Sequence, residues 1–162
     1  MKTMIRYLAF GAGLALAMPA SASTFKVYDS GNASEKITTL PGDNGWYVLY
    51  SVDIETINVG DIIIVMAEGQ LQDPTNTTDY YLTSHLIRAT SATGTTGTEI
   101  DDANAFNITQ QSYRGVPTKP AITTIGSGTT TRHFVNLLVQ AAAGNLNVNS
   151  DYGRLQVLKI TP

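Results

Sequence analysis

The sequence predicts an all-β protein that folds as an antiparallel β-sandwich of about 8–10 short strands. Thr, Val, Ile and Tyr dominate the candidate elements, and Gly, Asn, Asp and Pro separate these elements at short intervals. No stretch after the first 22 residues shows a convincing helical period, and no repeat of the length found in solenoids is visible. Short strands divided by turn residues in this way indicate a single layered domain.

The composition limits the classes of function. The chain has 162 residues, enough for one domain and a leader, with 10 Lys and Arg residues against 13 Asp and Glu residues. The net charge of -3 disfavours a protein that binds nucleic acid, because few basic side chains are present to neutralise phosphates. The absence of cysteine excludes disulfides, iron–sulfur clusters, thiolate zinc sites and cysteine nucleophiles.

The first 22 residues have the pattern of a cleaved signal peptide. Lys2 and Arg6 form a positive start, residues 8–18 are apolar, and residues 20–22 (Ala-Ser-Ala) provide a small-residue cleavage site. The apolar run is too short to anchor the chain across a membrane, and it lacks the polar face of an amphipathic helix. We therefore expect one domain over residues 23–162, exported to the periplasm or the exterior. Export without disulfides is more typical of a bacterial protein.

Residues 46–55 form the best candidate strand, followed by a turn at residues 58–61 and a second strand at residues 62–67. Side chains alternate between the two faces of a strand. In the first strand, one face is expected to carry the apolar set Trp46, Val48, Tyr50, Val52 and Ile54. The other face is expected to carry Ser51, Asp53 and Glu55. Residues 62–67 are apolar at every position, so we expect a central strand that is covered on both faces.

Four further strands are expected, over residues 80–90, 106–109, 131–142 and 154–160, with a short segment around Val148. The Ala-rich end of the third of these stretches leaves a helix as the alternative there. Residues 90–100 predict an exposed connection. Residues 111–120 predict a loop, since they contain two prolines and proline is excluded from the ladder of a central strand.

Three passages resemble the C1q/tumour-necrosis-factor-like jelly-roll family. Residues 45–52 (GWYVLYSV) are similar to its aromatic early strand, residues 57–63 (INVGDII) to the entry into a core strand, and residues 152–158 (YGRLQVL) to its closing, glycine-led strand. The resemblance covers residues 44–160. It implies a jelly-roll sandwich of ten strands, usually a homotrimer, that acts by binding and has no catalytic residues to transfer.

His85 and His133 are the candidate bases or metal ligands. Both fall in the middle of expected strands, and no recognised spacing joins them to a carboxylate. Ser84 and His85 are neighbours, so their side chains would point to opposite faces of a strand and could not form a nucleophile–base pair. We therefore expect a protein that is not an enzyme.

Two polar stretches offer oxygen ligands for calcium, which prefers six to eight of them. Asp73, Asn76 and Asp79 lie in one expected loop, and Asp101 and Asp102 lie in the other. Neither stretch has the spacing of an EF-hand or an RTX repeat, and turn chemistry explains them equally well. Calcium is the one candidate cofactor, and we expect no other cofactor.

Tyr113 and Arg114 are the candidate ligand-binding pair. They lie together in the expected proline-containing loop, where the ring would be exposed and the guanidinium would reach a hydroxyl or carboxylate of a ligand. The aromatic residues within strands are expected to belong to the core.

Three functions remain open. The first is a secreted, non-enzymatic sandwich that binds or self-assembles at the cell surface or in the matrix, including a filament subunit in which Ser23 to Asp29 completes the sheet of a neighbour. The second is a carbohydrate-binding module, with or without calcium, and the third is a small secreted hydrolase. Expected partners are further copies of the chain and a glycan or other surface ligand, with neither nucleic acid nor a transmembrane anchor.

Overall fold

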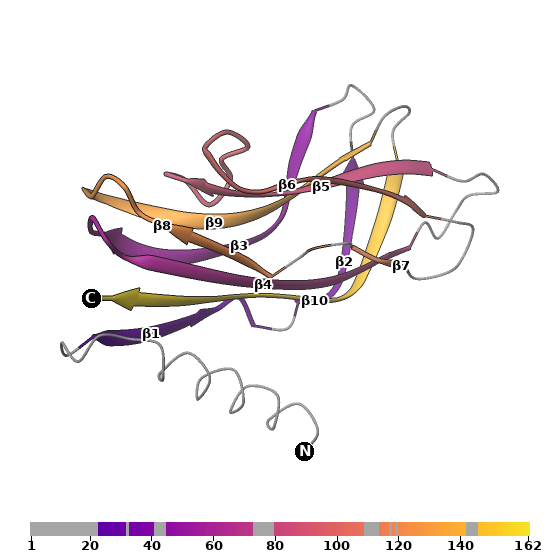
Figure 1. Cartoon of the computed structure of the whole chain (residues 1–162). Helices are drawn as coiled ribbons and strands as arrows, with labels where there is room; N and C mark the ends of the chain where they lie inside the picture. The colour runs from indigo at the N-terminus through magenta and orange to yellow at the C-terminus, as the bar shows by residue number, and fades with distance from the viewer. Residues whose placement is uncertain are drawn as a thin grey trace, which may run out of the picture.

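The computed structural model is a two-layer antiparallel β-sandwich, which confirms the predicted fold class (Figure 1). The structure describes residues 23–31, 33–40, 45–72, 80–108, 114–116, 118, 120–141 and 146–162. The expected signal peptide, residues 1–22, lies outside the described residues. Within the described part the chain forms ten strands and no helix.

The first layer, sheet A, contains six of these strands. They are β1 (Thr24–Asp29), β2 (Ala33–Leu40), β4 (Ile62–Gln72), β7 (Arg114–Gly115), β8 (Ala121–Thr124) and β10 (Leu146–Thr161). The long strand β10 pairs on one edge with β1 and β2, which follow one another along it, and on the other edge with β4. The far edge of β4 pairs with β7 and β8.

The second layer, sheet B, contains the other four strands. They are β3 (Trp46–Ile57), β9 (Thr129–Ala141), β5 (Tyr80–Ala89) and β6 (Thr98–Ile108), and they lie side by side in this order. The chain crosses repeatedly between the two sheets, although β5 and β6 are neighbours in sheet B, and β10 and β9 insert between earlier strands. With β1–β2 and β7–β8 each counted as one interrupted strand, this is the strand order of an eight-stranded jelly roll.

The facing sides of the two sheets enclose one apolar core. Its members come from both layers and are almost entirely inaccessible to solvent. They include Val52 and Ile54 of β3, Ile63 and Val65 of β4, Leu82 and Leu86 of β5, Val135, Leu137 and Val139 of β9, and Leu155 and Val157 of β10. Burial of these side chains is the main source of stability, because the chain has no disulfide.

The ring of Tyr50 joins the two sheets through a notch made by two glycines. Gly69 of β4 and Gly153 of β10 are direct partners in sheet A, and neither has a side chain to fill the space above them. A Cβ atom added at Gly153 would lie 1.9 Å from the Tyr50 ring and hydroxyl, and one added at Gly69 would lie 3.4 Å from the ring. Only glycine at position 153 therefore allows the Tyr50 side chain to pack here.

The predicted faces of β3 are wrong at its start. Val48 pairs with Leu138 but Tyr50 pairs with Leu137, so Leu49 is the extra residue of a β-bulge. The bulge reverses the alternation, and Trp46 and Val48 point away from the core that contains Tyr50, Val52 and Ile54. A single inserted residue moves every preceding side chain to the other face.

Trp46 and Val48 instead help to form a second apolar cluster on the outer side of sheet B. They pack against Ile87, Ala89 and Leu138. The connection between β5 and β6 folds back over this side, because the Asn136 side-chain amide donates to the carbonyl oxygens of Ser91 (3.0 Å) and Gly94 (2.8 Å). The predicted exposed connection is confirmed over residues 90–97, nearly all of which are exposed, and β6 begins at Thr98. The buried Asn136 holds this connection against the outer side of sheet B.

Several boundaries differ from the expectations. Residues 131–141 belong to strand β9, so the alternative of a helix is wrong over this stretch, and residues 142 and 143 lie outside the described residues. The turn at residues 58–61 is confirmed: the Asp61 carboxylate accepts a hydrogen bond from the Asn58 amide (2.9 Å), and Gly60 has a positive φ of 90°. Strands β1 and β2 were not expected. Strand β7 interrupts the predicted proline-containing loop at residues 111–120, and β8 follows this loop.

Replacing Gly153 with alanine should destabilise the fold strongly. The new methyl group would collide with the Tyr50 ring, and overpacking of this kind costs about 1–3 kcal/mol or more. Urea unfolding measures the free energy of unfolding of the variant. Gly126→Ala is the matched control, since nothing lies within 4 Å of the added Cβ atom there. Equal stability of the two variants would contradict the packing described, and Tyr50→Leu should restore part of the loss in Gly153→Ala.

Candidate interaction surfaces

Most residues of the predicted ligand and calcium sites are not placed. Tyr113, Asp73, Asn76 and Asp79 lie outside the described residues. Arg114 begins strand β7, where it pairs with Leu71 of β4. That Tyr113 and Arg114 together bind a ligand therefore stays a prediction.

Asp101 and Asp102 do not lie in a loop, and this expectation is wrong. They lie within β6, at a bulge where Ser84 pairs with Asn104 and Leu86 pairs with Asp101. The Asn104 side-chain amide donates to the Asp101 carboxylate (3.2 Å) and to the Asp102 carbonyl oxygen (2.8 Å). In the part of the chain that the structure describes, no three His, Cys, Asp or Glu side chains gather as metal ligands.

The two histidines lie on opposite faces of sheet B. His85 lies on the outer face, with its ring centroid 5.4 Å from that of Trp46 and its Nε2 atom 3.7 Å from the Glu99 carboxylate. His133 shares the inward side of β9 with Val135 and Leu137, and burial, together with the nearby charge of Arg88, lowers its pKa. His85 pairs with Leu138, five residues along β9 from His133, so the imidazoles are about 16 Å apart along the strand.

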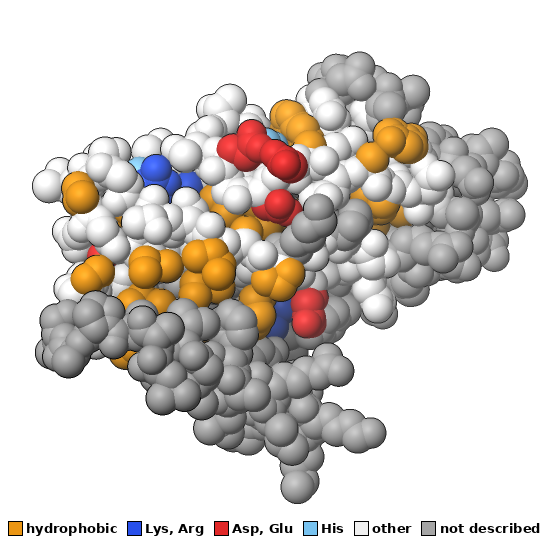
Figure 2. All heavy atoms as spheres, in the orientation of Figure 1, with side chains coloured by type: hydrophobic (Ala, Val, Ile, Leu, Met, Phe, Trp, Pro, Cys, Tyr) orange, Lys and Arg blue, Asp and Glu red, His pale blue; other side chains and the backbone are white. Residues whose placement is uncertain are grey.

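The outer face of sheet A carries an apolar strip that crosses four strands. The pairing places Phe25 beside Ile160, and Val27 beside Leu158. The strip continues over β4 and β8, through Ile62, Ile64, Met66 and Ile122. Figure 2 shows hydrophobic side chains gathered at the level of β8 and β4. We call these eight residues the assembly face.

Three members of the assembly face are strongly exposed: Phe25 (53 %), Val27 (66 %) and Ile122 (65 %). Strand β4 was expected to be covered on both sides, and it is central in sheet A, but every described strand belongs to one of the two sheets. No described strand therefore forms a third layer over it. The outward side chain of Ile64 is nevertheless buried (2 % exposed), so the expectation is confirmed at this position, while Ile62 and Met66 are half-buried. The alternation in residues 24–28, with Phe25 and Val27 on one side, is the sequence signal that would have revealed this face.

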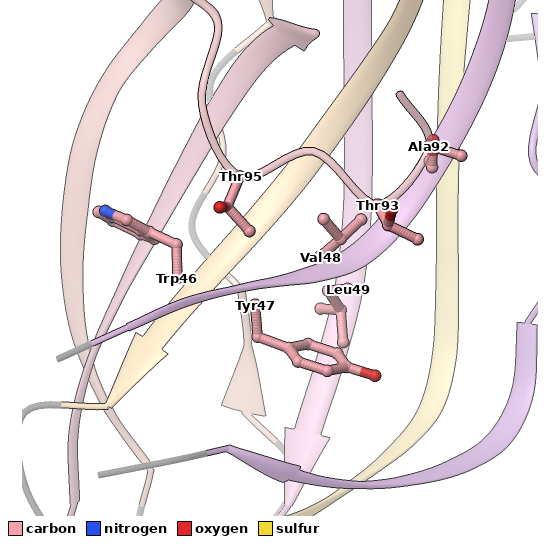
Figure 3. Close-up of a pocket in the computed structure, with 8 residues that line it drawn as sticks. Trp46, Tyr47, Val48, Leu49, Ala92, Thr93 and Thr95 are labelled. Carbon is pink, nitrogen blue, oxygen red and sulfur yellow. The ribbon is translucent and has the colours of Figure 1, made fainter. Parts of the chain in front are cut away.

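A groove of about 310 Å³ lies along the free edge of β3 (Figure 3). Among the described strands β3 pairs with β9 alone. Trp46, Tyr47, Val48, Leu49 and Ser51 form one side of the groove, and Ala92, Thr93 and Thr95 of the covering connection form the other. We call this the edge groove. No sequence pattern marks this groove, because the connection and the strand edge meet only in the fold.

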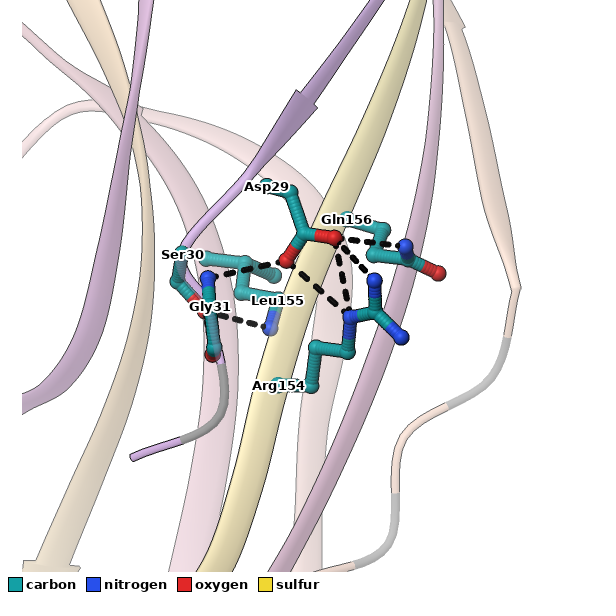
Figure 4. A network of polar contacts seen from close by, with 6 residues as sticks. All are labelled: Asp29, Ser30, Gly31, Arg154, Leu155 and Gln156. Atoms are coloured by element: carbon teal, nitrogen blue, oxygen red, sulfur yellow. Dashed lines mark hydrogen bonds and ion pairs between the residues drawn. The ribbon is translucent and has the colours of Figure 1, made fainter. Parts of the chain in front are cut away.

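Strand β1 is fixed at its end by a charged network (Figure 4). The Asp29 carboxylate accepts hydrogen bonds from the Arg154 guanidinium and from the Gln156 side-chain amide (2.9 Å), and also from the Gly31 backbone amide (2.9 Å). The hydrogen bond from Arg154 contributes most to holding the pKa of Asp29 at about 2. Ser30 adds two hydrogen bonds to the backbone of Leu155.

A second network ties β1 and β10 to β3 across the sandwich. Lys26 Nζ donates to the Glu55 carboxylate (2.6 Å), and the Tyr28 hydroxyl donates to it as well (3.2 Å). The buried Lys159 ammonium donates to the carbonyl oxygens of Ile54 (3.1 Å) and Thr56 (2.8 Å). Burial, with the neighbouring Glu55 carboxylate, raises the pKa of Tyr28, and the Lys26 hydrogen bond lowers the pKa of Glu55.

Replacing Asp29 with asparagine should remove an acid-sensitive part of the stability. The native pKa of Asp29, about 2, is below its ordinary value of 3.8, so the ionised carboxylate stabilises the fold above about pH 4 and this contribution is lost as the pH falls toward 2. Asp29→Asn should therefore lower the free energy of unfolding by about 1 kcal/mol near neutral pH and by almost nothing near pH 2.

Urea unfolding at several pH values measures this difference. Asp102→Asn, at an exposed position of β6, is the control and should behave like the unmodified protein throughout. The free energies of unfolding of Asp29→Asn and of the unmodified protein should differ less as the pH falls. If their difference were the same at every pH, the ionised carboxylate would not be its source.

The comparisons with known proteins find similarity only among solved structures. No family model matches the chain, and no curated protein matches it. The chain is similar to the structure of the infectious bursal disease virus Gx strain (TM-score 0.49, 14% identity, 85% of this chain and 32% of that chain). It is also similar to the VP2 subviral particle of the same virus (TM-score 0.48, 14% identity, 85% and 33%). The chain thus spans about a third of the length of the chains it matches.

Among the described residues, no helix is long and apolar enough to cross a membrane.

Proposed function

We propose that this protein is a secreted, non-enzymatic β-sandwich that acts by contact and associates with further copies of itself through the assembly face. The exposed apolar strip over Phe25, Val27 and Ile122 is the observation that carries the proposal. Large exposed apolar side chains gathered on one face of a soluble protein mark interaction sites. Between these three residues the strip is half-buried or buried, with Ile64 and Ile160 almost inaccessible. The separation of His85 from His133 supports a function without catalysis, because the two imidazoles do not share a site.

A second copy of the chain is the partner that suits this face best. The centre of the strip is uncharged, whereas Glu68 and the Asp29–Arg154 pair lie toward one end of it. An uncharged apolar surface is complementary to itself, as an interface between identical subunits related by a two-fold axis requires. The low net charge of the chain also means that two copies repel one another weakly.

Exchange of β1 between copies is the filament form of this proposal. Strand β1 pairs with β10 on one side and has no described strand on the other. Gly31, with a positive φ of 72°, follows it at the point where the chain could turn outward. A β1 strand from a neighbour would make the same pairs with β10, since the Asp29–Arg154 contact needs only those two strands.

Replacing Val27 with lysine should dissociate the assembly without unfolding the subunit. The side chain is 66 % exposed in the single chain, so the folded subunit tolerates a charge, but an interface would have to bury that charge at high cost. We expect association to weaken by about tenfold or more, measured by light scattering and sedimentation.

Val59→Lys is the matched control for this variant. Val59 is equally exposed, at 68 %, but lies in the turn after β3 and not on the assembly face. A protein that is monomeric without substitution, or that dissociates equally in both variants, would refute the proposal.

A designed disulfide tests whether β1 is exchanged. Thr24 of β1 and Thr161 of β10 are direct partners, and the natural chain has no cysteine. In the double variant Thr24→Cys and Thr161→Cys, exchange should give covalently linked chains on a non-reducing gel, because opposite positions of antiparallel strands lie within bonding range.

The two single variants show how much linkage arises without this pairing. A monomeric band in the double variant, at a concentration where the protein is assembled, would exclude strand exchange and leave the assembly face as the means of association.

A further inference from the structure

The edge groove presents two aromatic rings that the fold holds in place. Trp46 and Tyr47 project to opposite sides of the β3 backbone (Figure 3), and both are half-buried. Trp46 packs on the outer cluster and against the His85 ring, while Tyr47 packs against the core. Binding would therefore cost little ordering of either ring.

The opposite wall of the groove supplies hydroxyl groups. Thr93 and Thr95 belong to the connection that the Asn136 amide holds over sheet B. Ser51, on the strand side, donates its own hydrogen to the Asn136 amide oxygen (2.7 Å), which leaves the serine oxygen as an acceptor. The groove is thus lined by three hydroxyl oxygens, two on the connection and one on β3, together with the aromatic and aliphatic side chains of β3.

The lining is amphipathic and carries no charged side chain among its eight residues. This excludes a counter-charge for an anionic ligand, and the net charge of -3 repels such a ligand further. A sugar ring combines an apolar face with a rim of hydroxyls, so it matches aromatic and hydroxyl side chains placed together. The volume of about 310 Å³ lies at the lower end of the range for small-ligand sites.

We propose that the edge groove binds a neutral carbohydrate, at the end of a glycan or along a short oligosaccharide. The site lies on the free edge of sheet B, whereas the assembly face lies on the outer side of sheet A, so the two surfaces can be occupied together. Sugar binding here does not depend on the proposed self-association, and the Val27→Lys variant should bind as the unmodified protein does.

The fluorescence of Trp46 tests this proposal directly, because it is the one tryptophan of the chain. The full-length protein is titrated at constant pH with neutral cello-, malto- and N-acetylglucosamine oligosaccharides, and with sulfated oligosaccharides of equal length. We expect a saturable change in emission with at least one neutral series and none with the sulfated sugars.

Thr95→Val removes one hydroxyl of the groove and keeps the shape of the side chain. We expect sugar binding to weaken about threefold to tenfold, as for the loss of one hydrogen bond. Thr130→Val, at an exposed position of β9 near its opposite end, is the matched control and should bind unchanged.

Three results would overturn the proposal. They are a lack of response to every neutral sugar, a response that Thr95→Val leaves unchanged, and a response only to an extended apolar peptide that pairs with the β3 edge.

Discussion

The ring of Tyr50 fills the space above Gly69 and Gly153, and this contact fixes how the two sheets face one another. A side chain at position 153 would occupy the volume of the ring, so the sheets could not approach as closely. This contact also requires the Tyr50 side chain of β3 to point toward the core. Because Leu49 is an extra residue just before it, Trp46 and Val48 must then point outward. The outer cluster, the covering connection and the edge groove all follow from that reversal.

The two charged networks explain how β1 stays attached although it buries little. Its outward side chains Phe25 and Val27 stay more than half exposed in the single chain, so their burial contributes only part of what a core position would. Asp29, at the end of the strand, instead binds Arg154 of β10, and Lys26, in its middle, binds Glu55 of β3. These surface contacts are worth little individually, so β1 is the part of sheet A that can be released or exchanged at low cost. The same strand supplies two of the three most exposed residues of the assembly face.

The proposed activities depend on surfaces and not on reactive groups. The assembly face is apolar and crosses the outer side of sheet A, whereas the edge groove is uncharged and lies at the margin of sheet B. A jelly roll favours this separation, because its two sheets have independent outer faces and free edges on different strands. One copy could therefore be joined to others while its sugar-binding groove remains open.

The sequence by itself determined the fold class, most of the strands and the turn at Asn58 to Asp61, because alternation and turn residues act over a few neighbouring positions. It also determined that both histidines lie within strands. Only the tertiary structure decided which side chains face the core near Trp46, since a bulge depends on how β3 pairs with β9. It likewise decided that Asp101 and Asp102 lie in β6, where pairing with β5 outweighs their preference for turns. The tertiary structure also decided the edge groove and the full extent of the assembly face, of which only the alternation at Phe25 and Val27 is visible in the sequence. Each joins residues far apart in the chain, and strand pairing, not local preference, brings them together.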